Sequence, residues 1–337
     1  MSLSFIIECK YIKILSDKGE KSNLQNNLIK DQTQVGIWQY HRYLPEVPLE
    51  FRLSLNEGNT SEQELDPEIF LKREDQNPTG SLKDRGMAFL ISKASSLGFK
   101  QFVLSSSGNA AISAANYCAK ANLKLKVFVS VRVNKGKLKK LEQMKVDLSV
   151  DQRPLTMATR FAKENNFYNL RPSINEFGST GYQTIAFELL ENQDRIENLF
   201  VPVSSGVNFL GISKGFKKFG YVPKLHLCQS SFIFPLASIF DHNFVQEDSS
   251  FASALVARQS PLKKEILQAV ADSKGTGWVV DNKQTIQADK ILKQKGISTS
   301  FEGALTYAAV LKARQNDQLK GRTVCLLTGK NYSNDTT

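Results

Sequence analysis

A lysine near the start of a predicted helix is the first candidate for covalent chemistry in this sequence. Lys83 follows a Pro-Thr-Gly-Ser loop and lies one or two residues inside a helix that we expect from about Leu82 to Leu97. The positive end of that helix and its free backbone N–H groups disfavour the charged amine. We therefore expect Lys83 to have a lowered pKa and a nucleophilic amine. A lysine in a loop is otherwise, in most proteins, a solvated cation.

Two further loops offer groups that bind anions. Ser105–Ala110 reads Ser-Ser-Ser-Gly-Asn-Ala and lies between a predicted strand and an Ala-rich helix. Its hydroxyls and amides suit a carboxylate at a helix start, although a plain helix cap explains the same residues. Val201–Asn208 contains Gly206, where backbone can approach a ligand closely. This second loop is a weak phosphate-binding signal and is not a Walker sequence, because no Gly-Lys-Ser/Thr follows.

The loops fall between segments of alternating predicted structure. We predict strands at 70–73, 101–104, 123–130, 146–150, 199–203, 224–229 and 323–327. We predict helices at 82–97, 109–121, 135–144, 154–165, 181–191, 208–219, 262–272, 285–294 and 301–314. Strands that alternate with helices of roughly 10–15 residues indicate βαβ units, and therefore an α/β fold with mostly parallel sheets flanked by helices.

The composition is that of a globular chain with about two domains. Of its 337 residues, 41% are hydrophobic and 23% are charged, which argues against a disordered or collagen-like protein. No apolar run approaches the roughly 20 residues of a membrane helix, and Glu8 and Lys10 interrupt the apolar start that a signal peptide needs. The four cysteines lie far apart, which excludes a self-contained zinc ribbon and disfavours a disulfide framework. We expect a cytoplasmic protein with neither a membrane nor a metal as partner.

The charge balance favours anionic partners. The net charge is +11, from 44 basic and 33 acidic residues. Such an excess suits nucleic acid or phosphorylated metabolites. The lysines of Val133–Lys145 fall on a predicted helix and are typical of a solvated face. Since no zinc finger, RNA-recognition signature or basic zipper is present, we do not expect nucleic acid as a partner.

Taken together, the loops resemble the motifs of the pyridoxal-phosphate enzymes of the tryptophan-synthase-β fold, called fold type II. In that family a motif of the form Lys-x-Glu, then Pro-Thr-Gly-Ser-x-Lys-Asp-Arg-Gly, carries the Schiff-base lysine. The matching residues here are Lys72, Glu74, Pro78, Thr79, Gly80, Ser81, Lys83, Asp84, Arg85 and Gly86. The Ser-Gly-Asn turn, the Val201–Asn208 loop and Cys325–Gly329 follow in the family's order, so that the resemblance runs from about Trp38 to Gly329.

The resemblance implies pyridoxal 5'-phosphate as cofactor and a role for each matching residue. Lys83 would hold the cofactor covalently and serve as the base. Asn109 would contact the cofactor's 3-hydroxyl, and Thr328 would contact its ring nitrogen. The cofactor phosphate would be bound by Ser204, Ser205, Gly206, Val207 and Asn208. A neutral hydroxyl at the ring nitrogen favours elimination and replacement over transamination.

Within the superfamily the chain most resembles the threonine synthases. Trp38–Pro45, Leu55–Thr60, Gly181–Glu188 and Phe301–Ala304 are similar to motifs of that group. The resemblance implies conversion of O-phospho-L-homoserine and water to L-threonine and phosphate.

Two groups of residues are candidates for the substrate's own anions. Ser106 and Ser107 would bind the substrate carboxylate. Arg171 is our candidate for the substrate phosphate, because arginine can grip phosphate with two N–H groups, although an ordinary surface arginine is the simpler interpretation. The expected partners are this phosphorylated amino acid and a second copy of the chain in a homodimer.

The sequence also departs from the family pattern. The usual Thr-Pro-Leu of the early motif is Thr60-Ser61-Glu62, and Ser204 and Ser205 replace glycines of the phosphate loop. Because a β-branched residue resists positive φ, we expect Val207 to disturb the usual phosphate cradle.

The implied architecture is two α/β domains with the cofactor between them. We predict a larger, discontinuous domain made of residues 1–81 and 173–337, and a smaller inserted domain at 82–172. Three alternatives to a threonine synthase stay open: a threonine or serine dehydratase or related replacement enzyme, a cofactor-binding protein without turnover, and a nucleic-acid binder.

Overall fold

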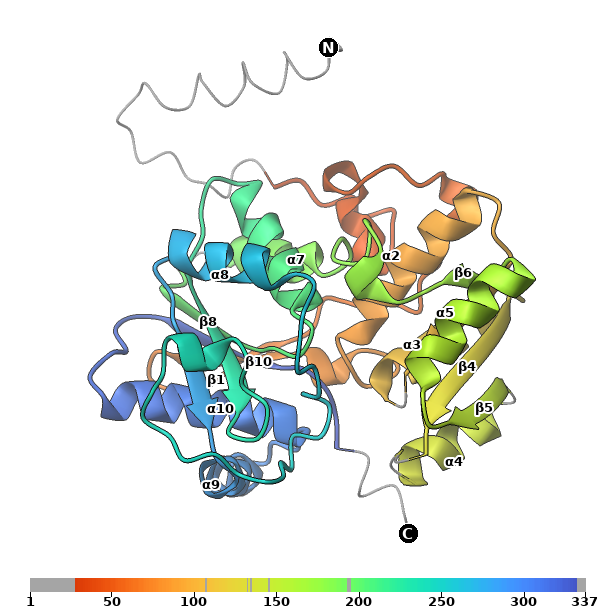
Figure 1. The fold of residues 1–337 in the computed structure, drawn as a ribbon. Helices are drawn as coiled ribbons and strands as arrows, with labels where there is room; N and C mark the ends of the chain where they lie inside the picture. The colour runs from red at the N-terminus through yellow and green to blue at the C-terminus, as the bar shows by residue number, and fades with distance from the viewer. Residues whose placement is uncertain are drawn as a thin grey trace.

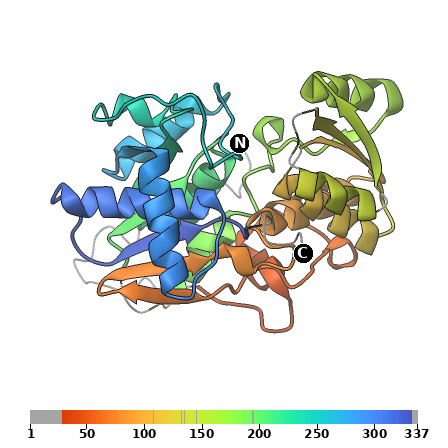
Figure 2. The same cartoon turned by 90° about the horizontal axis from the view of Figure 1, so that it is seen from below.

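The computed structural model describes residues 28–331 except 107, 132, 134, 145, 193 and 194, and shows two sheets in two lobes that lie side by side (Figures 1 and 2). The larger sheet has the order β1 (Glu62–Asp66), β2 (Ile69–Arg73), β10 (Thr323–Leu327), β7 (Asn198–Pro202), β8 (Lys224–Ser230) and β9 (Gly277–Val280). The smaller sheet has the order β5 (Asp147–Asp151), β4 (Lys124–Ser130), β3 (Gln101–Ser105) and β6 (Tyr168–Asn169). Only the β1–β2 pair is antiparallel among these strands. The predicted α/β class is confirmed.

Helices flank both sheets, and their bounds agree with the predicted ones to within a few residues. They are α2 (Lys83–Ser96), α3 (Asn109–Lys120), α4 (Lys135–Gln143), α5 (Pro154–Asn165), α6 (Gln183–Glu191), α7 (Val207–Lys217), α8 (Lys263–Asp272), α9 (Asn282–Gln294) and α10 (Phe301–Gln315). Shorter 3-10 turns are η2 (Gly36–Tyr43), η3 (Leu49–Phe51), η4 (Glu74–Gln76), η5 (Pro172–Ile174) and η6 (Ala237–Ile239). Helix α9 starts earlier than predicted because Asp281 and Gln284 form a reciprocal capping box.

Three strands that the sequence analysis did not predict complete the sheets. β1 is a polar edge strand in which only Leu65 is buried, so that it has no apolar pattern to recognise. β6 has two residues and β9 has four, which is too short for a periodic signal. The apolar pattern therefore predicts the central strands and the edge strand β5, whereas the edge strands β1, β6 and β9 give no such pattern.

The larger sheet is buried on both faces. Along β7, Leu199 and Val201 belong to one apolar cluster, and Phe200 between them belongs to another. The same alternation occurs in β10, where Val324 and Cys325 lie in different clusters. Since successive side chains of a strand point to opposite faces, the two clusters are the cores on the two sides of the sheet.

A third cluster fills the smaller lobe. It combines apolar residues of α2, α3, β3 and β4 with residues of the segment 37–47, including Ile37, Trp38 and Tyr40. The four strands of the smaller sheet lie between residues 101 and 169. The proposed domain bounds at 82 and 172 stay a prediction. No helix in the described part of the chain is both long and apolar enough to cross a membrane.

The parallel strands bring the three motif loops to the carboxyl edges of the sheets. In the larger sheet, Leu327 of β10 pairs with Arg73 of β2, and β10 and β7 run parallel beside each other. The loops after β2, β7 and β10 therefore leave from one edge. In the smaller sheet, Val103 of β3 pairs with Asn169 of β6, so that the loops after these strands also leave from a common edge.

Candidate active site

The turn before Lys83 is fastened to the end of β10. The Leu82 N–H donates to the Thr328 carbonyl at 3.0 Å, and Ser81 forms a bridge with Gly329. Gly80 has φ +86°, and a side chain there would meet the stem of Lys330. Hydrogen bonds and a required glycine thus fix the backbone from which Lys83 projects.

Lys83 is the first residue of α2 and is partly buried. Its Nζ lies 5.7 Å from the centre of the Tyr182 ring. Burial lowers the pKa of Lys83 to about 8, and the Glu302 carboxylate acts in the opposite direction. The lowered pKa agrees with the sequence-based expectation, and burial of the amine is its main cause.

Asn109, the first residue of α3, reaches the same turn from the smaller lobe. Its Nδ2 lies 2.8 Å from the position that a β-carbon on Gly329 would occupy. Its Oδ1 is buried and has no hydrogen-bond partner among the described residues. A buried amide oxygen without a partner is unfavourable, so the geometry points to a missing polar ligand at this place.

The loop between β7 and α7 leaves backbone N–H groups at a helix start. Gly206 has φ +83°, and α7 begins directly after it with Val207, without a side-chain cap. The positive φ lies at Gly206, and Val207 does not adopt one but is the first residue of α7, so that the expected effect of Val207 on the cradle stays a prediction. The uncapped start of α7 suits an anion. Ser204 and Ser205 precede it, and Asn208 donates to the Pro202 carbonyl at 3.3 Å.

Among the remaining predicted site residues, Thr328 follows β10 directly and is partly exposed. The hydroxyl of Ser106 accepts from the Gly108 N–H at 3.3 Å and so supports the turn before α3. Ser107 lies outside the described residues.

Arg171 follows β6, at the edge that the 106–108 loop also leaves. Its Nε donates to the Ser173 hydroxyl at 3.1 Å, and its backbone N–H donates to the Asn169 side chain at 3.0 Å. The structure thus brings Lys83, Asn109 and Thr328 together, and it places Arg171 only at the common edge of the smaller sheet.

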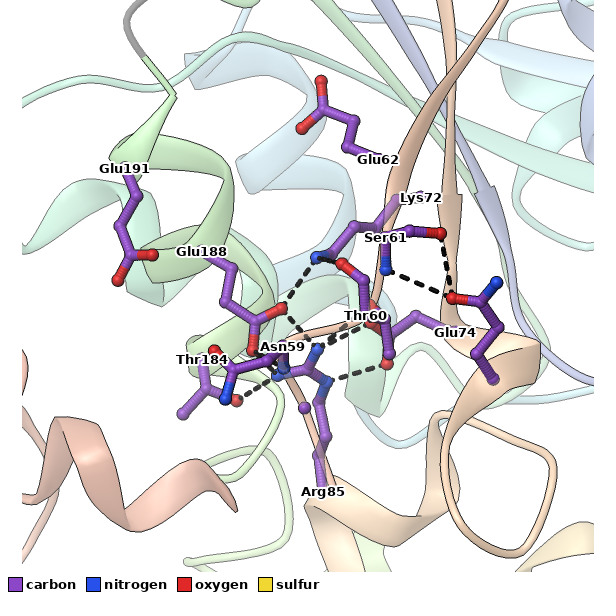
Figure 3. A network of polar contacts seen from close by, with 12 residues as sticks. Asn59, Thr60, Ser61, Glu62, Lys72, Glu74, Arg85, Thr184, Glu188 and Glu191 are labelled. Atoms are coloured by element: carbon purple, nitrogen blue, oxygen red, sulfur yellow. Dashed lines mark hydrogen bonds and ion pairs between the residues drawn. The ribbon is translucent and has the colours of Figure 1, made fainter. Parts of the chain in front are cut away.

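A buried network of four charges includes Arg85, which lies two residues after Lys83 on α2 (Figure 3). Arg85 Nε and Nη2 each donate to Glu74 at 2.7 Å, and its Nη1 and Nη2 donate to Glu188 at 2.6 and 2.7 Å. Lys72 donates to Glu188 at 2.7 Å and to the Thr60 carbonyl at 2.6 Å. Two cations therefore balance two carboxylates, and each carboxylate accepts several hydrogen bonds.

This network joins β2, η4, α2 and α6. Burial opposes ionisation of Glu188, but Arg85 and Lys72 outweigh it and lower its pKa to about 2. Lys72, Glu74 and Arg85 are motif residues in the sequence, but their pairing with Glu188 is visible only in the fold. The signal available was Lys72 at the end of an apolar run and Glu188 inside another, because such charged residues are buried only when paired.

The residues present fit pyridoxal phosphate. The unpartnered oxygen of Asn109 needs a polar group beside the Lys83 turn, and the N-terminus of α7 can receive a phosphate. Lysine, amide and helix start come from three loops that meet at the carboxyl edges of the sheets, where ligands of α/β proteins bind.

Comparison with known proteins points to the same cofactor. The family model described as "Pyridoxal-phosphate dependent enzyme" matches residues 50–329. The threonine synthase of Methanocaldococcus jannaschii is 31% identical over 326 residues, which cover 88% of this chain and 80% of that protein. The threonine synthase of Halalkalibacterium halodurans is 28% identical over 326 residues, which cover 89% of this chain and 90% of that protein.

Solved structures show the fold. Processed threonine deaminase isoform 2 from Solanum lycopersicum superposes with a TM-score of 0.71 at 19% identity, with 90% of this chain and 93% of that chain covered. Maize serine racemase superposes with a TM-score of 0.69 at 19% identity, with 78% of this chain and 83% of that chain covered. At these identities the structures support the fold type II assignment, and the family match supports the cofactor. The chain therefore belongs to the family of pyridoxal-phosphate-dependent enzymes.

Proposed function

We propose that this enzyme is a threonine synthase, a carbon–oxygen lyase that converts O-phospho-L-homoserine and water to L-threonine and phosphate. The observation that carries this proposal is the likeness to proteins named threonine synthase, one of which is 31% identical over 88% of this chain. The motif residues of the Lys83 turn support it, since Lys72, Glu74 and Arg85 form one network.

In this proposal the loops at the sheet edges hold the cofactor. Lys83 would bind it covalently, Asn109 would contact its ring hydroxyl, and Thr328 would contact its ring nitrogen. The loop residues Ser204, Ser205, Gly206, Val207 and Asn208 receive its phosphate at the start of α7. When bound, pyridoxal phosphate supplies an electron sink for the charge left after a proton leaves the amino acid's α-carbon.

Lys83 also moves the proton in this scheme. With a pKa of about 8, roughly a tenth of the amine is neutral at pH 7, and a neutral amine can accept the α-proton. The Tyr182 ring beside the amine limits where the amine can move. Ser106 and Ser107 bind the substrate carboxylate, and Arg171 binds its phosphate.

The direct test is an assay with O-phospho-L-homoserine that follows phosphate and threonine together. Equal amounts of both products, formed at the same rate, are expected. Deamination of threonine without any use of the phosphorylated substrate would contradict the proposal and would identify a dehydratase instead.

Replacement of Arg171 by alanine is expected to raise KM for O-phospho-L-homoserine about 10- to 100-fold, because a charged hydrogen bond to phosphate is lost. The kcat is expected to change less. The measurement is steady-state kinetics, with Arg160→Ala as the control, since Arg160 is exposed and pairs with Glu164 on the same helix. An unchanged KM in the Arg171 variant would remove this residue from the substrate site.

The rate at which cofactor-free protein takes up pyridoxal phosphate is expected to rise with pH and to level off above about pH 8, as the Lys83 amine loses its proton. Since the Glu302 carboxylate raises the pKa of Lys83, Glu302→Gln is expected to move the midpoint to lower pH. Stopped-flow absorbance measures this rate. A midpoint that stays in place in the Glu302 variant would show that this carboxylate does not act on Lys83.

A further inference from the structure

The segment 252–260, which we call the strap, crosses from the core to the phosphate loop. It lies between η6 and α8 and has no regular structure. Ala252 and Leu255 are buried in the core on the α10 side of the larger sheet and anchor the strap. The Ala254 N–H donates to the Glu302 carboxylate at 2.8 Å. The strap is therefore held at one end beside α10.

The other end of the strap binds oxygen atoms of the phosphate loop. The Ser260 hydroxyl donates to the Ser205 carbonyl at 2.7 Å, and the Ala257 N–H donates to the Ser204 hydroxyl at 3.3 Å. Ser260 in turn accepts from the Leu262 N–H at 3.1 Å, which fixes the direction of its own proton. The strap thus occupies two acceptors of the loop that precedes α7.

These hydrogen bonds change which donors and acceptors of the loop are available to an anion. A carbonyl oxygen or a hydroxyl lone pair repels a phosphate, whereas N–H and O–H groups bind it. Because Ser204 accepts from the strap, its own proton stays available for donation. Because Ser205 has its carbonyl engaged by Ser260, the loop presents its N–H groups and the positive end of α7.

We propose that Ser260 is a positioning residue for the cofactor phosphate, which acts by holding the Ser205 carbonyl and thereby orienting the 204–208 loop as a set of donors. The proposal rests on the assignment of this loop to the cofactor phosphate. It also gives a reason why a serine can stand at 204: the strap supplies a donor, the Ala257 N–H, to its hydroxyl, which a glycine would lack.

The test compares pyridoxal phosphate with pyridoxal, which lacks the phosphate, in fluorescence titrations of cofactor-free protein. Ser260→Ala is expected to weaken binding of pyridoxal phosphate about three- to tenfold and to leave pyridoxal binding unchanged. Ser260→Thr, which keeps the hydroxyl, is expected to bind as the unmodified protein does. Ser253→Ala is the matched control, because Ser253 is an exposed serine on the same strap.

An equal loss of affinity for both ligands in Ser260→Ala, or no loss of affinity for either, would overturn the proposal. Ser204→Ala separates this failure from failure of the loop assignment. If Ser204→Ala weakens the binding of pyridoxal phosphate alone while Ser260→Ala does not, the loop binds the phosphate and the strap does not position the loop. If neither variant distinguishes the two ligands, the loop assignment itself is wrong.

Discussion

Lys83→Ala is expected to lower the turnover of O-phospho-L-homoserine by at least about 10³-fold, because in the proposed scheme the variant loses both the covalent hold on the cofactor and the base at the α-carbon. The absorbance band of the bound cofactor is expected to disappear in the same variant. Steady-state assay and absorption spectroscopy measure the two effects.

Lys93→Ala is the control for this change. Lys93 lies on the same helix, α2, and its amine donates to the Glu46 carbonyl near the surface. Both turnover and absorbance are expected to persist in this variant. If Lys83→Ala kept the absorbance band and the turnover, another residue would have to hold the cofactor.

The second large effect is expected from Glu188→Gln, which removes one carboxylate from the buried network. Arg85 and Lys72 would then share only Glu74, and one buried cation would lack a counter-charge. Breaking a buried pair by removal of one partner costs about 3–5 kcal/mol. We expect a loss of that size in the free energy of unfolding, measured by urea unfolding of the cofactor-free protein.

Glu191→Gln is the matched control, one helical turn further along α6. Glu191 lies outside the network in Figure 3, and it pairs with Lys30 near the surface and with the Tyr40 hydroxyl. We expect Glu191→Gln to lower the free energy of unfolding by only about 1 kcal/mol, because partly exposed ion pairs contribute little to stability. Equal losses in the two variants would contradict the role given to the network.

The central strands and most helices could be predicted from the sequence, because they carry a periodic apolar pattern. β10 has the predicted bounds, and α2 begins within a residue of the predicted start. Lys83 and the α7 loop were also predictable, because their motifs are local. The polar edge strand β1 was not, since its single buried side chain gives no pattern.

Contacts between distant residues account for most of what the sequence analysis missed. Glu188 pairs with Lys72 across 116 positions, and the Ser260 hydroxyl reaches a carbonyl 55 positions away. Nothing in the local sequence indicates either partner. The cause of the lowered pKa of Lys83 was missed for the same reason, because burial depends on segments such as the one around Tyr182 that come together only in the fold.

The most direct measurement is chemical fixation of the cofactor in the resting enzyme. Borohydride reduction followed by proteolysis and mass spectrometry is expected to find the pyridoxyl group on the peptide that contains Lys83, and on its amine. A pyridoxyl group on a different lysine, or none on this peptide after complete loss of the cofactor band, would contradict the account.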